Sequence, residues 1–470
     1  MKFRLLIAFL IPAAVAVAGI AAIAWWLRAA AVPTVPLRLP GADGAVAAAG
    51  TGAVAAVRGE LTRGDGQAST RLGEWPQFRG PARTGVALGG EAWPTAWPTN
   101  GPRVVWNLAV GEGHAGAAVW QGRVYLVDYD RERHRDVVRC LSLDDGRDLW
   151  RYAYPDDVKR NHGMSRTVPA VTNGLLVAVG PKCTVTALDP LTGERRWAID
   201  LVREYGTTVP PWYAGQCPLI DGGRVIIAPG GKALLMAVDG QTGAVVWSVP
   251  NPRGWKMTYS SIIPIEIGGR RQYVYCASDG VVSVAAEDGT VLWTTTDWKI
   301  SIANVPTPVV LGEGRLLLSG GYNAGAALLE VAAGATGYSA RVTARFPPTV
   351  FGADQQTPIF YDGSIYGVRP GGELVCLDPA GKLRWASGPG DRYGIGPFVV
   401  AGDRLLVMND TGRLTMVRAK PTGFERLAEA QVLPGEDSWG PMAVAGDYVI
   451  VRDLTTLKCL DLGAGKDRRP

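Results

Sequence analysis

Cysteine and histidine are scarce in this chain, and neither occurs in a spacing that serves a metal or a haem. The 470 residues contain 6 cysteines and 3 histidines. There is no Cys-x-x-Cys motif, no Cys-x-x-Cys-His haem-attachment motif and no adjacent cysteine pair. Cys140, Cys376 and Cys459 lie on expected strands that lead into turns, so we expect them to be buried packing residues. The sequence therefore predicts no metal site. One disulfide bridge among the other three cysteines is possible and cannot be assigned from the sequence.

A strong excess of charge is also missing. The chain carries 48 basic and 43 acidic residues, for a net charge of +5, and no basic run is interleaved with aromatic residues. Proteins that bind the phosphates of nucleic acid usually concentrate basic residues in one patch. The charge pattern therefore excludes nucleic acid as the expected partner.

Charge is absent altogether from residues 5–27, which follow a basic N-terminus and end in Trp25, Trp26 and Leu27. About 20 apolar residues span a bilayer, and tryptophan favours its interface. We therefore expect residues 1–28 to be a signal-anchor that crosses the inner membrane through residues 5–27 and leaves the remainder periplasmic. The alternative is a signal peptide cleaved near residues 29–31, which would release a secreted protein. Residues 29–73, rich in Ala, Gly, Thr and Pro, are expected to be a flexible linker.

One short motif is repeated along the rest of the chain. It reads LDPLTG at residues 188–193 before Trp197, VDGQTG at residues 238–243 before Trp247, and LDPAG at residues 377–381 before Trp385. In each copy the aspartate can accept hydrogen bonds from the turn, the glycine adopts positive φ without strain, and the tryptophan anchors the outgoing strand. The motif therefore predicts a repeating unit built on antiparallel hairpins.

A second marker gives the number of units, because a proline opens an apolar strand that meets a glycine-containing turn a few residues later. These prolines are Pro169, Pro218, Pro264, Pro308, Pro358, Pro397 and Pro441. Ala118 holds the same place in the first unit, so there are eight units at intervals of about 40 to 50 residues. The predicted fold is all-β, an eight-bladed β-propeller of four-stranded antiparallel blades over residues 103–462.

The two ends of the repeat region predict how the ring closes. The eighth unit stops after residue 462 without an outgoing strand, whereas a spare strand containing Trp106 precedes the first unit. We expect this N-terminal strand, at residues 103–108, to complete the last blade, which leaves no exposed edge at the seam. Residues 74–102 are expected to be a lead-in segment packed on the ring, and residues 463–470 a tail.

These repeats resemble the pyrroloquinoline quinone (PQQ)-like repeat propellers of the quinoprotein alcohol dehydrogenase-like superfamily. The resemblance rests on the three motif copies and on WPQFRGP at residues 75–81, with Arg83 and Gly85, which looks like the segment before the ring in exported bacterial members. Members include quinone-dependent dehydrogenases and an outer-membrane assembly lipoprotein, so the resemblance implies the fold and allows either role. The dehydrogenases commonly carry adjacent cysteines over the quinone and a Glu, an Asn and an Asp around calcium. This chain has no adjacent cysteine pair and no carboxylate cluster with calcium-loop spacing.

Candidate binding residues come from the loops that feed the innermost strands, because these loops gather at one mouth of a propeller. They lie at residues 113–115, 160–166, 205 with 212–213, 255–259, 298–299 with 304, 351–356, 391–393 and 436–439. Aromatic faces beside cations suit a planar anionic ligand such as the quinone. The predicted cofactor contacts are Trp255, Lys256, Trp298, Lys299, Arg392 and Trp439. For the tryptophans the alternative is packing between blades, with the lysine heads in solvent. Two further residues are candidate catalytic groups, His162 for proton transfer and Asp354 as a base.

The sequence favours a non-catalytic role. We expect an exported, membrane-tethered scaffold for binding or assembly in the cell envelope, with an envelope protein or polymer at the loop-lined face. The alternative is a PQQ-dependent oxidoreductase of alcohols or sugars, which would hold calcium only together with PQQ. The two hypotheses differ in whether the protein must hold a redox cofactor and a metal.

Overall fold

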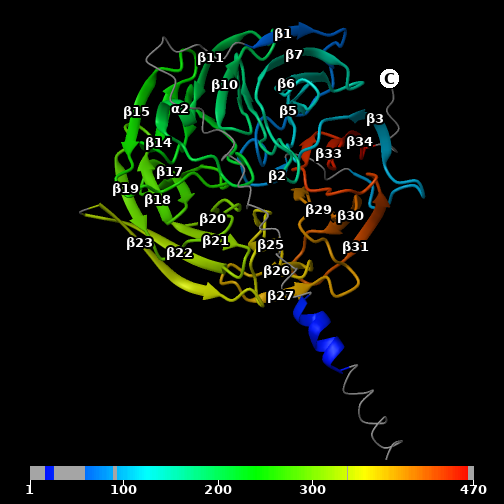
Figure 1. Cartoon of the computed structure of the whole chain (residues 1–470), viewed down its shortest axis with the longest axis vertical. Coiled ribbons are helices and arrows are strands. Elements are labelled where there is room, and N and C mark those ends of the chain that lie inside the picture. Colours follow the sequence, from blue (N-terminus) through cyan, green and yellow to red (C-terminus); the bar gives the residue numbers. More distant parts are fainter. Residues whose placement is uncertain (1–15, 26–58, 88–92, 336, 464–470) are drawn as a thin grey trace, which may run out of the picture.

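The strands form eight sheets arranged as blades around one axis, as the computed structural model shows (Figure 1). The structure describes residues 16–25, 59–87, 93–335 and 337–463. Each blade has four antiparallel strands, and two blades carry one extra strand at an edge. The predicted eight-bladed propeller is therefore confirmed.

The first strands of neighbouring blades contact one another, so they are the innermost strands of the ring. From the axis outward, blades 1 to 4 contain β4 (Ala118–Trp120), β5 (Arg123–Asp130), β6 (Arg135–Ser142) and β7 (Asp148–Pro155); β8 (Ala170–Thr172), β9 (Leu175–Val179), β10 (Thr184–Leu188) and β11 (Arg195–Asp200); β12 (Leu219–Asp221), β13 (Arg224–Ile227), β14 (Ala233–Asp239) and β15 (Val245–Pro250); β16 (Ile263–Ile267), β17 (Arg270–Ala277), β18 (Gly280–Ala285) and β19 (Val291–Thr295).

Blades 5 to 8 follow the same order. They contain β20 (Val309–Gly312), β21 (Arg315–Gly320), β22 (Gly325–Gly334) and β23 (Gly337–Phe346); β24 (Ile359–Tyr361), β25 (Ser364–Val368), β26 (Leu374–Leu377) and β27 (Leu383–Ala386); β28 (Phe398–Ala401), β29 (Arg404–Met408), β30 (Arg413–Arg418) and β31 (Arg426–Gln431); β32 (Ala443–Ala445), β33 (Tyr448–Arg452), β34 (Thr456–Asp461) and β3 (Arg103–Ala109). The extra strands are β1 (Glu60–Arg63) and β2 (Val86–Ala87), and a short helix, α2 (Leu201–Tyr205), follows β11.

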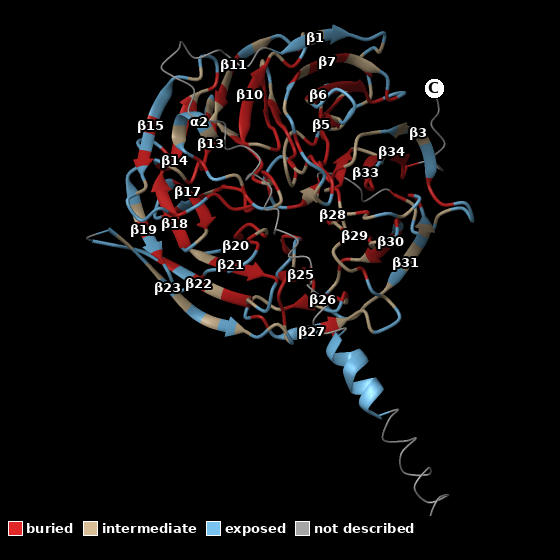
Figure 2. Ribbon diagram, viewed as in Figure 1, coloured by how far each residue is buried: buried red, intermediate tan, exposed pale blue. Residues whose placement is uncertain are grey.

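Burial follows the position of a strand within its blade (Figure 2). The middle strands β9 and β10 are buried along their whole length. The outermost strand β15 alternates, with Trp247 and Val249 buried and their neighbours exposed. Since both faces of the middle strands carry apolar side chains, each blade packs against the blades on either side, and the core consists of layers between blades.

The repeated motif joins one blade to the next. In the first copy Asp189 Oδ1 accepts hydrogen bonds from the backbone N–H groups of Leu191 and Thr192, both at 2.9 Å. The tryptophan of the preceding blade, Trp150, donates from Nε1 to the Pro190 carbonyl oxygen at 3.3 Å. Equivalent bonds run from Trp197 to the Gly240 carbonyl and from three further strand-end tryptophans, Trp106, Trp247 and Trp385, to the following turns. Each such tryptophan therefore anchors its own strand to the turn of the next blade.

The ring closes as the sequence predicts. β3 pairs antiparallel with β34, with Trp106 opposite Cys459 and Leu108 opposite Leu457. Because β3 comes from the N-terminal side and β34 from the C-terminal end, the last blade contains both ends of the repeat region. Trp106 Nε1 also donates to the Leu143 carbonyl oxygen at 3.0 Å, which joins this blade to blade 1.

Residues 59–73, which composition assigns to a flexible linker, are part of the folded ring instead. β1 pairs antiparallel with β7, so that Leu61 lies opposite Tyr152. Beyond the strand, Ser69 N donates to the Gly122 carbonyl oxygen at 3.0 Å. The linker prediction is wrong for these residues because a segment without apolar periodicity can still pair through its backbone. Linker residues before 59 lie outside the described part of the chain.

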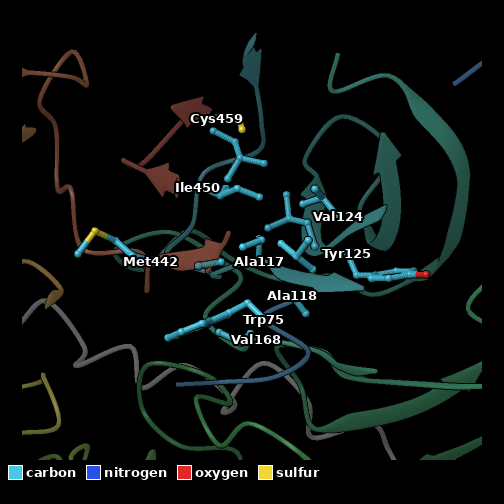
Figure 3. Packing of buried hydrophobic residues seen from close by; sticks show 14 of the residues in the cluster. Trp75, Ala117, Ala118, Val124, Tyr125, Val168, Met442, Ile450 and Cys459 are labelled. Carbon is cyan, nitrogen blue, oxygen red and sulfur yellow. The ribbon is translucent and has the colours of Figure 1, made fainter. Parts of the chain in front are cut away.

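Residues 75–87 of the lead-in segment lie inside the ring, against the free edges of innermost strands. The Val119, Val171 and Val400 amides donate to the carbonyl oxygens of Trp75, Pro76 and Gly85 at 2.8, 2.8 and 2.9 Å. β2 continues this contact as a parallel neighbour of β28. Figure 3 shows Trp75, which is 1% exposed, beside Ala117, Ala118 and Val168 in one buried cluster.

Two arginines fasten the lead-in segment across the axis. Arg83 Nη1 donates to the Pro218 carbonyl oxygen of blade 3 at 3.0 Å. Arg79 donates from Nη1 to the Thr357 carbonyl oxygen at 2.8 Å and from Nη2 to that of Pro358 at 2.9 Å, both in blade 6. The segment therefore connects blades that lie far apart in the sequence.

The predicted N-terminal features fall mostly outside the described residues. Residues 16–25 form a helix, whereas residues 1–15, the cleavage region at 29–31 and tail residues 464–470 are not described. Within the described ranges, no helix has the length and apolar character needed to cross a membrane. All six cysteines are buried and unpaired, so the disulfide that the sequence left open is not formed.

Candidate functional site

A cavity of about 400 Å³ lies at the axis, where the loops that precede the innermost strands meet. These loops contribute lining residues from every blade, and the lead-in segment contributes Trp75, Phe78, Arg79 and Gly85. We call this space the mouth cavity. Because the lead-in segment is bonded to the innermost strands from inside the ring, it forms the floor of the mouth cavity.

Aromatic side chains form much of the wall. Trp212 and Tyr259, from the loops of blades 3 and 4, have ring centroids 6.2 Å apart. The Trp212 amide also donates to the Tyr259 hydroxyl oxygen at 3.0 Å, which holds the two loops together. On the blade 8 side, Trp439 donates from Nε1 to Asp410 Oδ1 at 2.8 Å. Such fixed rings offer flat apolar faces to a ligand.

Arg79 and Arg166 are the cations of the lining, and within the described residues both donate to backbone carbonyl oxygens. Arg166 Nη2 donates to the carbonyl oxygens of Asn161 and His162 at 2.7 and 2.9 Å. Burial lowers the pKa of Arg166 to about 10, and burial followed by repulsion from Arg83 lowers that of Arg79 to about 9. Both therefore stay charged near neutral pH, and neither forms an ion pair with a described residue.

Two histidines lie at the edge of the mouth cavity. His114 is 9% exposed and its ring lies 5.1 Å from that of Trp439. Its Nε2 lies 3.0 Å from the His162 carbonyl oxygen, so Nε2 carries the proton and Nδ1 the lone pair. Burial and the charges of Arg166 and Arg452 lower the pKa of His114 to about 3. His114 is therefore neutral at physiological pH, and its Nδ1 has no partner among the described residues.

Amides complete the lining, and acidic side chains do not take part in it. Gln356 Nε2 donates to the carbonyl oxygens of Gly394 and Gly396 at 3.0 and 3.1 Å, whereas Gln355 is exposed. Within the described ranges no aspartate or glutamate lines the mouth cavity. The arrangement suits recognition of an anionic group by cations, aromatic faces and amides.

The structure brings together two of the residues that the sequence nominated. His162 and Trp439 line the mouth cavity. Trp255 and Trp298 do not line it, because their rings are 5% and 3% exposed and pack in the layers between blades 3 and 4 and between blades 4 and 5. The interpretation of these two tryptophans as ligand contacts is therefore replaced by the alternative of packing between blades.

The remaining nominated residues lie outside the lining. Lys256, Lys299 and Arg392 are exposed. Asp354 is partly buried beside Gly321, and burial raises the pKa of its carboxyl above the ordinary value. It lies next in sequence to Gln355 of the lining, so it borders the mouth cavity without facing it.

Sequence reasoning missed Arg79, Tyr259 and Tyr322 as lining residues. Tyr259 belongs to a loop that the sequence identified. The contacts predicted from that loop were Trp255 and Lys256, and these two residues do not line the mouth cavity. Arg79 belongs to the lead-in motif at residues 75–81. The signal that could have identified it as a lining residue is an arginine without an acidic neighbour in the sequence. Tyr322 lies between β21 and β22, outside the loops that precede the innermost strands.

Comparisons with known proteins agree with this architecture. The family model described as outer membrane protein assembly factor BamB matches residues 82–208 and 134–380, which together span more than half of the chain. The chain belongs to this PQQ-like repeat propeller family. No curated protein matches it.

Solved structures show the same fold at low sequence identity. BamB from Moraxella catarrhalis is 14% identical, with a TM-score of 0.55 over 77% of this chain and 99% of that one. A europium-containing methanol dehydrogenase is 15% identical, with a TM-score of 0.60 over 82% and 90%. The quinohemoprotein alcohol dehydrogenase ADHIIG from Pseudomonas putida HK5 is 14% identical, with a TM-score of 0.54 over 85% and 81%. These similarities establish the fold, and the solved structures that share it include both BamB and dehydrogenases.

The residues of the mouth cavity fit the quinone of a quinone–calcium pair, but not the calcium ion. Its aromatic faces and arginines suit a planar anionic ring. Calcium requires a set of oxygen ligands rich in carboxylates, and no described carboxylate lines the cavity. Nor do the described ranges contain a group of three or more His, Cys, Asp or Glu residues that could hold a metal ion. The pair as a whole therefore does not fit the mouth cavity.

Proposed function

We propose that this chain is a binding or assembly scaffold of the cell envelope, in which the ring is structural and the mouth cavity holds the recognised group. The observation that carries this proposal is the lining, in which the described residues combine arginines, aromatic rings and amides without an acidic side chain. These groups hold a ligand, but they do not pair a nucleophile with a base. The neutral His114 can accept a hydrogen bond and has no proton to donate from its Nδ1.

The envelope location rests on two supports. The family model that matches most of the ring is described as an outer membrane protein assembly factor. The uncharged residues 5–27 after a basic N-terminus are typical of an export signal or anchor. We therefore place the ring outside the cytoplasm, tethered by residues 5–27 or released after cleavage, with an envelope protein or polymer as its partner.

A quinone-dependent oxidoreductase of alcohols or sugars is the second candidate. Its support is the fold, which the chain shares with dehydrogenases, together with the aromatic rings and arginines of the mouth cavity. In that case Trp212, Trp439 and Arg166 would hold the quinone, and Asp354 at the border would be the candidate base. Bound quinone would supply the two-electron acceptor.

The experiment that tests the scaffold role is site-specific photocrosslinking in cells. A photoreactive residue replaces Tyr322, which is 42% exposed at the mouth cavity, and in the control it replaces Val246, which is 45% exposed on the outermost strand β15. We expect one discrete envelope adduct from position 322 that is missing from position 246. Identical adduct patterns at both positions would overturn the proposal.

A separate assay tests the oxidoreductase. The full chain is titrated with PQQ, with and without calcium, and dye reduction is followed with a panel of alcohols and sugars. The scaffold role predicts no turnover under either condition. Calcium-dependent turnover would establish the second candidate in its place.

A further inference from the structure

We infer that the mouth cavity recognises the free C-terminus of a polypeptide whose last residue is aromatic or apolar. This inference rests on the proposed function of the cavity as a binding site and names what it binds. It is carried by three independent features of the cavity, which are its closed floor, its unpaired positive charge and its aromatic walls.

The floor requires that a chain-like ligand enter the cavity with one of its termini. The lead-in segment is bonded to innermost strands of blades 1, 2 and 7 and is held by Arg79 to blade 6, so its backbone crosses the axis below the cavity. A chain that entered the cavity could not leave on the other side. An extended polymer would therefore have to place its terminus, and not its middle, against the floor.

The charge of the cavity requires that this end be anionic. Arg79 lies at the floor and Arg166 in the wall, and their hydrogen bonds to carbonyl oxygens leave their positive charges without a carboxylate among the described residues. Arg83, directly behind Arg79, also bonds only to carbonyl and amide oxygens. Arg79 and Arg166 each donate four hydrogen bonds to carbonyl oxygens, so the attraction of a carboxylate comes chiefly from the unneutralised charges, and it strengthens where water is excluded.

The walls require that the group attached to this anion be apolar. Trp75 and Phe78 lie at the floor, and Trp212, Tyr259 and Trp439 stand around it. Farther out, Tyr322, His162 and Gln355 are exposed, and they offer polar atoms to the residues that precede the terminus. A C-terminal aromatic or large apolar residue would contact the aromatic rings at the floor and wall, and the residues before it would contact the polar atoms at the rim.

The test compares two forms of one peptide on the full chain. An N-terminally labelled tetrapeptide ending in phenylalanine is titrated by fluorescence anisotropy as the free acid and as the C-terminal amide. Because hydrogen bonds to a charged group contribute about 1.5–3 kcal/mol, we expect the free acid to bind about 10- to 100-fold more tightly. Equal binding of the two forms, or binding of neither, would overturn the inference.

A third ligand separates the peptide from a small molecule. Free phenylpropionate carries the same carboxylate and ring without a peptide chain, and we expect it to compete only weakly. If it binds and the peptide acid does not, the inferred polypeptide terminus is wrong, while the mouth cavity remains a binding site. The photocrosslinking result at position 322 reports on the proposed function independently of all three ligands.

Variants then locate the carboxylate. Arg166→Gln removes the charge and Arg166→Lys retains it, whereas the matched control Arg160→Gln changes an exposed arginine of the same loop that pairs with Glu112 outside the cavity. We expect a loss of at least about 10-fold for Arg166→Gln, partial retention for Arg166→Lys and no change for Arg160→Gln. Equal affinities for Arg166→Gln and Arg160→Gln, with unchanged thermal unfolding, would contradict the role of Arg166.

Discussion

Single turn glycines determine how closely neighbouring blades approach. Gly243 has a φ of 74°, and a Cβ atom added to it would lie 2.9 Å from the Trp197 ring of the preceding blade. Gly193 stands in the same relation to Trp150. The glycine of the repeated motif is therefore needed both for backbone conformation and for the approach of the neighbouring tryptophan.

A pair of substitutions separates these two requirements. Gly222→Ala tests conformation alone, because its φ is 55° and nothing lies within 4 Å of an added Cβ. We expect it to lower the free energy of unfolding by about 1–2 kcal/mol. Gly243→Ala should cost about 1–3 kcal/mol more, because it also overpacks against Trp197. Urea unfolding measures both, and equal losses would show that the tryptophan contact adds no constraint.

Burial of Asp156 makes stability depend on pH. Its carboxyl lies 3.9 Å from Lys182 Nζ, with a side chain 8% exposed. Burial raises the pKa of Asp156 to about 6, although attraction to Lys182 opposes this, and the nearby Asp200 and Asp157 raise the pKa further. Burial also raises the pKa of the neighbouring Asp136. The folded protein therefore keeps a proton on Asp156 that the unfolded chain releases above its ordinary pKa of 3.8.

Because the folded pKa is raised, this contribution to stability is fully present below about pH 4 and is lost as the pH rises through 6. Asp156→Asn cannot ionise, so it does not lose this contribution as the pH rises. Between pH 4 and pH 7 the free energy of unfolding of the variant should therefore increase relative to that of the parent by on the order of 2–3 kcal/mol. Urea unfolding across this range measures the gain. Asp65→Asn, whose side chain is 79% exposed, is the control, and a pH-independent difference for Asp156→Asn would contradict the assignment.

At the scale of elements, closure of the ring depends on one strand. β3 supplies the outermost strand of blade 8, and without it β34 would present an open edge and blade 8 would lose Trp106. A chain that begins at residue 103 keeps β3, whereas a chain that begins at residue 111 lacks it. We expect the first to unfold in one cooperative transition and the second to lose that transition. Equal near-ultraviolet dichroism and equal urea midpoints for the two chains would show that β3 does not close the ring.

Strands were easier to predict than the faces of loops. The proline and turn markers located every innermost strand, since Pro169 precedes β8, Pro218 precedes β12 and Pro358 precedes β24. A turn that contains Gly and Asp forms through bonds within a few residues, so its signal is local. The side to which Trp255 points depends on the blade beside it, and no pattern in its own loop records that.

At the scale of the whole molecule, the lead-in segment stabilises the ring from inside and provides the floor of the mouth cavity. A chain that begins at residue 74 keeps it, one that begins at residue 103 does not, and both lack β1. Losing Trp75 and its neighbours should cost at least about 3 kcal/mol of unfolding free energy, because buried aromatic contacts are lost. Urea unfolding of the two chains measures this difference.

Hydrogen exchange tests the same deletion in detail. The amides of Val119, Val171 and Val400 lose their acceptors on the lead-in segment, so we expect their exchange to accelerate. Strand β16 of blade 4 makes no described hydrogen bond to that segment and serves as the internal control. A uniform acceleration of amide exchange over all blades would show that the deletion destabilises the whole ring, and not only the strands bonded to the lead-in segment.

The sequence by itself determined the class of fold, the number of blades and the strand that closes the ring. These properties follow from local signals, because seven of the eight repeats carry an opening proline and several also carry an aspartate–glycine turn and a strand-end tryptophan. Only the tertiary structure decided that Trp255 and Trp298 pack between blades, that residues 59–73 join blade 1 and that Arg79 and Arg166 face one cavity. Contacts such as that between Arg79 and Thr357 join residues hundreds of positions apart. They arise when the ring closes around the lead-in segment, and no short stretch of sequence specifies them.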